Sequence, residues 1–248
     1  MSFNMDYVTQ SQIGLNKTCP YKWMCYRLKI PTTPREEKFS IAGITIHQAI
    51  REYYQVIDEN PLHTGVIEGT ARQIFDRLWK GAGNSVKDMG DRKDRCLNNF
   101  IKFETRRYGK WQRFKPDMVE ERLKAKINGY GYLTILDTFW IHDGILVDWK
   151  TGAKTTLDWI DLIQGHVEEM ILKSMGFTVK KVLFECLLNG LEIQLPQVDD
   201  AMVEAEVAKM YATVEKGDFP KIKSPACLWC DWITKCSLDD RGLCIWLL

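Results

Sequence analysis

The sequence predicts an α/β domain in which helices flank a mixed β-sheet. Three observations support this fold class: apolar residues recur at helical spacing in the first half of the chain, three short runs rich in β-branched and apolar residues occupy its middle, and helical and strand patterns alternate after them. That order of elements is typical of α/β proteins. The 248 residues are 45% hydrophobic, which is enough apolar material for the core of one large domain.

Residues 1–116 are predicted to be mainly helical. The first 34 residues predict an irregular or helical segment, and apolar residues at helical spacing then predict three helices, over residues 44–56, 66–80 and 91–107. In the first of these helices Ile50, Tyr53 and Tyr54 fall at spacings that share one face. The glycine-containing residues 81–83 predict a loop after the second helix.

Residues 117–198 carry the strand patterns, and residues 199–248 close the chain. Strands are predicted over residues 118–127, 131–140 and 144–149, a helix over 160–175, further strands over 179–188 and 193–195, and a last helix over 199–216. Short turns separate the first three strands, which predicts a meander. We expect all of these parts to form a single domain over residues 1–248.

The overall charge gives no footprint of nucleic-acid binding, because 34 basic residues stand against 33 acidic ones. A local basic patch for nucleic acid is predicted between Phe100 and Lys126, a segment that contains nine basic and four acidic residues. The aromatic residues interleaved with these charges are Phe103, Tyr108, Trp111 and Phe114. Basic side chains that contact phosphates, together with aromatic rings that stack on unpaired bases, are typical of proteins that bind single-stranded nucleic acid. The alternative is a solvated helix face whose aromatic residues are buried.

The chain shows no sign of a membrane segment or of an oxidising compartment. No run approaches the roughly 20 apolar residues that a membrane span needs. We therefore expect a cytoplasmic protein, in which the eight cysteines are metal ligands and buried thiols rather than disulfides.

Two aspartates and a lysine in the strand region form the first candidate site. Asp148 and Lys150 are two residues apart on a predicted strand and therefore project to the same face, and Asp137 lies towards the end of the neighbouring strand. Two such carboxylates can hold an oxygen-preferring ion such as Mg²⁺, and the lysine can position or activate water beside it. The alternative is a solvent-facing ion pair on a strand edge.

Four cysteines at the two ends of the chain form the second candidate site. Cys227, Cys230 and Cys236 make a C-x₂-C-x₅-C run, which needs a fourth soft ligand. Cys19 is the first candidate for this ligand, and Cys25 is its rival. The spacing suits zinc or an iron–sulfur cluster and does not separate them.

The motifs together resemble one nuclease family, in the same order along nearly the whole chain. Ser11-Gln12-Ile13 with Cys19-Pro20 resembles its opening segment, and Gly43 to His47 its helix-borne histidine motif. Asp137 matches the family's first aspartate, and Asp148-Trp149-Lys150-Thr151-Gly152 matches its D-x-K-T-G strand. Gln164 matches its helical glutamine, and its terminal cysteine triad is matched by Cys227, Cys230 and Cys236. The chain resembles the RecB-like branch of the PD-(D/E)xK nucleases, in the iron–sulfur subgroup that includes AddB-type and CRISPR-associated nucleases.

The resemblance implies a restriction-endonuclease-like core, an N-terminal helical region and a terminal iron–sulfur clip. His47, Asp137, Asp148 and the backbone carbonyl of Trp149 would bind Mg²⁺ or Mn²⁺. Lys150 would orient the attacking water or stabilise charge on the scissile phosphate, and Gln164 would shape the site or touch DNA. The set that would hold a [4Fe–4S] cluster is Cys19, Cys227, Cys230 and Cys236.

The function implied is a DNA nuclease, and more narrowly an exonuclease on single-stranded or end-bearing DNA. The chain has no P-loop motif, so a helicase or a recombination or CRISPR-adaptation protein would be a separate partner. Two positions depart from the family pattern: Glu168 stands where a tyrosine is common, and Thr134 where a glycine is common. The alternatives are a non-catalytic DNA-binding or scaffold protein of the same fold and a four-cysteine zinc protein of unrelated fold.

Overall fold

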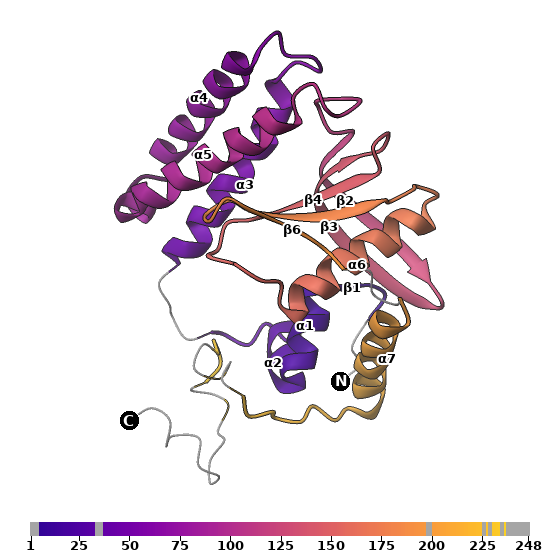
Figure 1. Ribbon diagram of the computed structural model, residues 1–248. Coiled ribbons are helices and arrows are strands. Elements are labelled where there is room, and N and C mark those ends of the chain that lie inside the picture. The colour runs from indigo at the N-terminus through magenta and orange to yellow at the C-terminus, as the bar shows by residue number, and fades with distance from the viewer. Residues whose placement is uncertain are drawn as a thin grey trace. The chain divides into compact units, whose positions relative to one another are not determined.

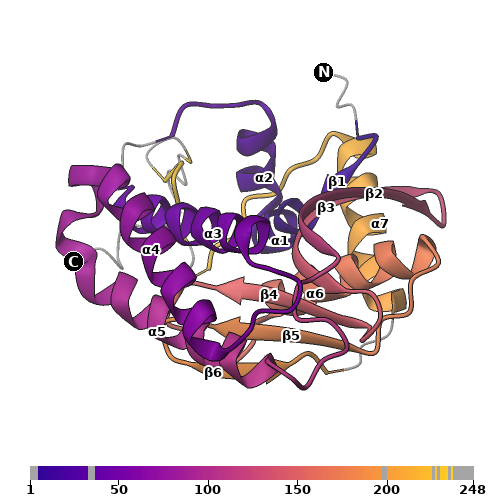
Figure 2. The ribbon, with the colours of Figure 1, turned by 90° about the horizontal axis from the view of Figure 1, so that it is seen from above.

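The computed structural model describes residues 5–32, 37–196, 200–224, 227, 230–233 and 236, in two compact units (Figures 1 and 2). Unit 1 comprises Met1–Arg35, Lys124–Leu133 and Val198–Leu248, and unit 2 comprises Glu36–Leu123 and Thr134–Gln197. Two long strands, β2 (Met118–Ile127) and β3 (Tyr130–Trp140), run through both units.

A group of helices forms the first layer of unit 2. It consists of α3 (Lys38–Val56), α4 (Thr64–Ala82), the 3₁₀ segment η1 (Gly83–Met89) and α5 (Gly90–Arg107). α4 begins after His63, whose ring nitrogen accepts a hydrogen bond from the Gly65 amide at 3.1 Å, and it ends at Gly83, which has a φ of +59°. The three predicted helices are confirmed, but α3 begins at Lys38, six residues before the predicted start, and residues 81 and 82 belong to α4 and not to the predicted loop.

The second layer of unit 2 is a mixed sheet, as the sequence predicted. β3 pairs with β2 and, antiparallel, with β4 (Ile145–Lys150). β4 pairs parallel with β5 (Lys181–Cys186), and β5 pairs antiparallel with β6 (Leu191–Gln194). The connection from β4 to β5 passes through α6 (Trp159–Ser174), since two parallel strands need a crossover.

Helices cover both faces of this sheet. Val147, Trp149 and Leu183 pack in one apolar cluster with residues of α3, α4 and α5. Val182 and Phe184 point the other way, towards Gly165 of α6, because side chains alternate along a strand. A Cβ atom at Gly165 would lie 2.8 Å from Leu195 Cδ2 and 3.2 Å from Phe184 Cζ. Glycine at this position therefore lets α6 approach the sheet.

A fully buried ionic cluster lies between α5 and the sheet. The Arg107 guanidinium forms ion pairs with Glu104 and Glu185, and both carboxylates are completely buried. Three indole rings surround this guanidinium, with centroids at 4.9, 5.2 and 5.0 Å, and they belong to Trp111, Trp140 and Trp149. Burial raises the pKa of Glu185 to about 7 although Arg107 opposes the shift. Two buried carboxylates thus share the Arg107 cation, and the half-exposed Arg106 lies 4.0 Å from Glu185.

This packing contradicts the prediction that the segment from Phe100 onwards presents rings for unpaired bases. Phe103 and Phe114 are buried, and Trp111 packs edge-on against Trp140 with ring centroids 4.6 Å apart. Arg107 is only 3% exposed. The aromatic residues pack into the core although charged residues lie between them in the sequence, because burying apolar side chains is favourable.

Unit 1 contains β1 (Val8–Thr9), α1 (Gln10–Thr18), α2 (Pro20–Arg27) and α7 (Asp200–Lys216). β1, which the sequence did not predict, pairs parallel with the start of β3 through Val8–Tyr132 and Thr9–Leu133. α1 begins with a capping box between Thr9 and Gln12. No helix in the described part of the chain is long and apolar enough to cross a membrane.

Candidate active site and cysteine cavity

The β3–β4 ladder ends where the two predicted aspartates begin. The last regular pairs join Trp140 to Ile145, Phe139 to Leu146 and Thr138 to Val147, so Asp137 and Asp148 follow as the next opposite residues. Opposite residues of an antiparallel pair present their side chains on the same face. At this point Asp137 Oδ2 accepts a hydrogen bond from the Trp149 amide at 2.7 Å. The sheet therefore brings both carboxylates to one place.

Lys150 and Gln164 complete a polar network around Asp148. The Lys150 ammonium lies 2.8 Å from Asp148 Oδ1 and donates to Gln164 Oε1 at 2.7 Å. The Gln164 amide nitrogen, on α6, donates to the other Asp148 oxygen. Asp148 is only 2% exposed. Burial raises the pKa of Asp148 to about 6, with Lys150 opposing the shift and Asp137 adding to it.

Lys150 is held as a cation in this network. Burial alone would lower the pKa of Lys150, but the Asp148 carboxylate outweighs burial and holds this pKa above its ordinary value. Asp161, at the start of α6, adds a contact at 3.5 Å. A lysine that stays protonated at neutral pH can donate hydrogen bonds and positive charge, but it cannot accept a proton.

The two departures from the expected family pattern contact each other. Thr134 Oγ1 donates to Glu168 Oε1 at 3.3 Å, and the same carboxylate oxygen accepts from the Gln164 amide at 3.3 Å. Glu168 is fully buried, and burial together with Asp148 and Asp137 raises its pKa well above the usual range. Thr134 and Glu168 thus contact each other and orient Gln164, a contact that no pattern in the sequence indicated.

His47 and Glu120 lie on the other side of Asp137. The Nδ1 atom of His47, on α3, is 3.5 Å from Asp137 Oδ1 and 3.4 Å from Glu120 Oε1. Glu120, on β2, was not among the predicted site residues. Its neighbour Glu121 has the same side chain but is exposed, and nothing in the sequence distinguishes the two. Glu120 has a φ of +50°, a left-handed conformation set by the surrounding structure.

An open groove of about 490 Å³ borders this site. Its lining residues all belong to unit 2, and they are Ile44, His47, Gln48, Arg51, Glu120, Ile135 and Asp137. Ile44 and Ile135 are 66% and 49% exposed. The groove therefore combines apolar walls, one arginine and the carboxylates in one place.

The donor set fits a divalent cation. Ligand atoms of His47, Glu120 and Asp137 all lie within 4.8 Å of one another. The backbone carbonyl of Lys150 accepts a hydrogen bond from the amide of Leu187, which follows β5. Because backbone groups alternate along a strand, the amide and carbonyl of Trp149 face β3, and this amide donates to Asp137. The alternation along β4 thus places the Trp149 carbonyl on the same side of the strand as its amide. Asp148, another predicted metal ligand, is not part of this group of three, and its two oxygens contact Lys150 and Gln164.

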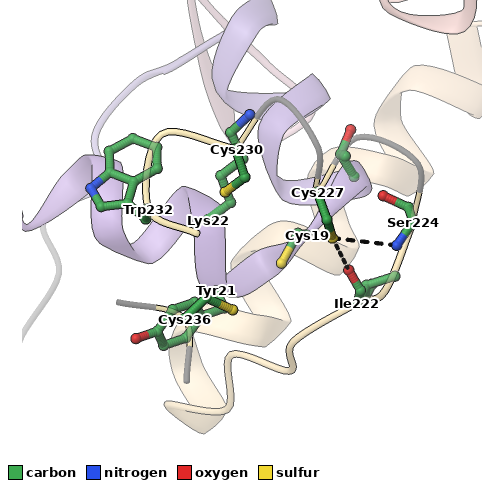
Figure 3. Close-up of a pocket in the computed structure, with 10 residues that line it drawn as sticks. Cys19, Tyr21, Lys22, Ile222, Ser224, Cys227, Cys230, Trp232 and Cys236 are labelled. Carbon is green, nitrogen blue, oxygen red and sulfur yellow. Dashed lines mark hydrogen bonds between the residues drawn. The ribbon is translucent and has the colours of Figure 1, made fainter. Parts of the chain in front are cut away.

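The four predicted cysteines line one cavity in unit 1 (Figure 3). Cys19 lies between α1 and α2, and Cys227, Cys230 and Cys236 surround the same space together with Tyr21 and Trp232. The Ser224 amide donates to Cys227 Sγ at 3.5 Å. The rival, Cys25, is completely buried nearby, and burial raises its pKa.

The model of one family, the PD-(D/E)XK nuclease superfamily, matches residues 7–237. The chain belongs to the PD-(D/E)XK nuclease superfamily. It is a DNA nuclease, and such nucleases use divalent metal ions, for which the acidic site described above is suited. This membership removes the alternative of a zinc protein with an unrelated fold.

One solved structure, of a protein from Eubacterium rectale proposed to be an exonuclease, resembles this nuclease over 92% of the present chain and 88% of its own. The TM-score is 0.50 and the sequence identity 13%, so the likeness shows the fold. No curated protein matches the chain.

Proposed function

We propose that this nuclease removes nucleotides from single-stranded or end-bearing DNA by metal-dependent hydrolysis of phosphodiester bonds. The observation that carries the proposal is the meeting of Asp137, Asp148, Lys150 and Gln164 where the β3–β4 ladder ends. A divalent ion bound by His47, Asp137, Asp148 and the Trp149 carbonyl would supply Lewis-acid chemistry, polarising a phosphoryl oxygen and lowering the pKa of water.

The residues of the chain supply positioning and charge. Lys150 stays protonated, so we assign it to hydrogen bonding with the attacking water and to stabilising the charge that develops on the scissile phosphate. Gln164 holds Lys150 and Asp148 in fixed orientation through both ends of its amide. Glu168 and Thr134 hold Gln164 in turn.

The groove supports the choice of substrate. Its volume of about 490 Å³ falls within the range of pockets for small ligands, roughly 300–1,000 Å³. It has room for an unpaired nucleotide or a frayed end. Ile44 and Ile135 offer apolar contact to a base, and Arg51 offers charge to a phosphate.

An assay on matched DNA substrates tests this function. Wild-type protein with Mn²⁺ or Mg²⁺ is expected to degrade end-labelled linear single strands and to leave circular single strands intact, and Asp137→Asn is expected to abolish degradation. Rapid cutting of circles would contradict exonuclease action. Binding of DNA without any cleavage by wild-type protein would favour a non-catalytic DNA-binding or scaffold role.

We further propose that the cysteine cavity holds a [4Fe–4S] cluster, which places the chain in the iron–sulfur subgroup. The supporting observations are the four cysteines around one cavity and the amide that donates to Cys227. The cluster would have a structural role, and the prediction of one domain over residues 1–248 belongs to this proposal.

Metal analysis distinguishes a cluster from zinc. Protein purified without oxygen is expected to be brown and to contain iron and inorganic sulfide in equal amounts, and Cys230→Ser is expected to lose both. Cys96→Ser serves as the control, because Cys96 is buried in the apolar cluster of unit 2. A colourless protein that contains one zinc per chain would contradict the cluster.

The resemblance to the RecB-like nucleases also suggests a cellular location and partner proteins. We propose a cytoplasmic nuclease that acts with a helicase or with a recombination or CRISPR-adaptation protein, since the chain has no P-loop of its own.

A further inference from the structure

We propose that Glu120 is a ligand of the divalent ion, together with His47 and Asp137, and that the mixture of imidazole and carboxylate ligands at this site binds Mn²⁺ in preference to Mg²⁺. The inference rests on the proposed function, because it concerns the same metal-dependent site. It adds a ligand from β2 to the His47, Asp137, Asp148 and Trp149 set.

The first support is the geometry of the three side chains. Each comes from a different element, α3, β2 or β3, and their ligand atoms converge to within 4.8 Å. His47 Nδ1 lies 3.4 Å from Glu120 Oε1 and 3.5 Å from Asp137 Oδ1. The side chains of Glu120 and Asp137 are 24% and 12% exposed, so both border the groove without being fully solvated. A cation can therefore reach them from the groove.

The second support is the backbone of β2. Glu120 has a φ of +50°, and the left-handed region is unfavourable for a residue with a Cβ atom. Glu120 faces His47 while the adjacent Glu121 is exposed, as side chains alternate along a strand. Strain of this kind concentrates at functional sites, where the surrounding structure holds it.

The third support is the way in which Asp148 is occupied. Its two oxygens contact Lys150 and Gln164, so Glu120 is the carboxylate that stands beside His47 and Asp137. Replacing one oxygen ligand by an imidazole nitrogen disfavours Mg²⁺, which prefers an oxygen shell and gives up its waters reluctantly. Mn²⁺ accepts carboxylate and imidazole together.

Metal binding without DNA tests this proposal separately from nuclease activity. The free Mn²⁺ signal in an electron paramagnetic resonance titration is measured for wild type, Glu120→Gln, Glu120→Gly and the control Glu121→Gln, with Mg²⁺ as competitor. We expect Glu120→Gln and Glu120→Gly to weaken Mn²⁺ binding at least about tenfold. Glu121→Gln is expected to bind Mn²⁺ like the wild type, and Mg²⁺ is expected to compete only at large excess.

Thermal unfolding of the metal-free proteins separates a ligand from a structural residue. Glycine adopts a positive φ without steric cost, so Glu120→Gly is expected to unfold at a temperature no lower than the wild type while losing the metal. Unchanged Mn²⁺ affinity in Glu120→Gln would overturn the proposal, and so would a loss of affinity that accompanies unfolding in both variants. If wild-type protein fails to cut DNA but these affinities differ as expected, the proposed function fails and the ligand assignment stands.

Discussion

Replacing Lys150 by alanine is expected to lower the rate of DNA cleavage by about 10²–10³-fold, as removal of one group that stabilises developing charge does in other active sites. Lys150 contacts Asp148 and Gln164 at 2.8 and 2.7 Å, and it is held as a cation. The variant therefore removes the charge beside the scissile phosphate. It also leaves the buried Asp148 carboxylate without its cation, which raises the pKa of Asp148 further.

Lys154→Ala provides the matched control. Both lysines contact Asp161, but Lys154 otherwise pairs with Asp158 at 2.9 Å, at the exposed start of α6. We expect the Lys154 variant to keep its cleavage rate within about threefold, because an exposed ion pair contributes little. Single-turnover rates at saturating Mn²⁺ and saturating DNA measure the effect. Equal losses in both variants would show that the start of α6, rather than the Lys150 charge, controls the rate.

Replacing Arg107 by methionine is expected to lower the free energy of unfolding by about 3–5 kcal/mol at pH 8, the usual cost of removing one partner from a buried ion pair. Methionine keeps an apolar stem among the three indole rings but removes the cation that pairs with the buried Glu104 and Glu185, and leaves Glu185 only the Arg106 guanidinium at 4.0 Å. The adjacent Arg106 is 42% exposed, so Arg106→Met is expected to cost less than about 1 kcal/mol. Urea unfolding of the two variants measures the difference.

The loss of unfolding free energy in Arg107→Met is expected to depend on pH. The pKa of Glu185 is about 7 in the folded protein and about 4.3 in an unfolded chain, so the folded state binds more protons between these values. The contribution of Glu185 to the unfolding free energy therefore falls as the pH rises through this window. In Arg107→Met the two carboxyls can be neutralised by protonation at pH 5, so the loss there should be smaller than at pH 8. Equal losses at both pH values would indicate a packing defect.

This buried cluster bears on the active site through Trp149. The Trp149 ring packs 5.0 Å from the Arg107 guanidinium, while its backbone amide donates to Asp137 on the other side of the same strand position. The cluster thus holds the segment of β4 that carries Asp148 and Lys150. A buried ion pair is weak evidence for stability in itself, and we attribute its value here to fixing this strand.

Much of the fold was predictable because its signals are local. The strand predicted over residues 118–127 coincides with β2, the helix predicted at 91–107 differs from α5 by one residue at its start, and the helix predicted at 160–175 differs from α6 by one residue at each end. β1 was missed because two residues carry no periodicity. For the basic segment the structure bears out the alternative of buried aromatic residues. The sequence left this open, because the burial of Phe103 and Phe114 depends on packing against distant residues.

The sequence by itself determined the order of the helices and strands, the shared face of Asp148 and Lys150, and the spacing of the cysteines, because each depends on residues close together in the chain. The tertiary structure alone decided that Thr134 and Glu168 support Gln164, and that Glu120 rather than Glu121 faces His47. Those contacts join different helices and strands, and the conformation at Glu120 is unfavourable for the residue itself. Only the packing of the surrounding elements can hold it, so no local pattern could reveal it.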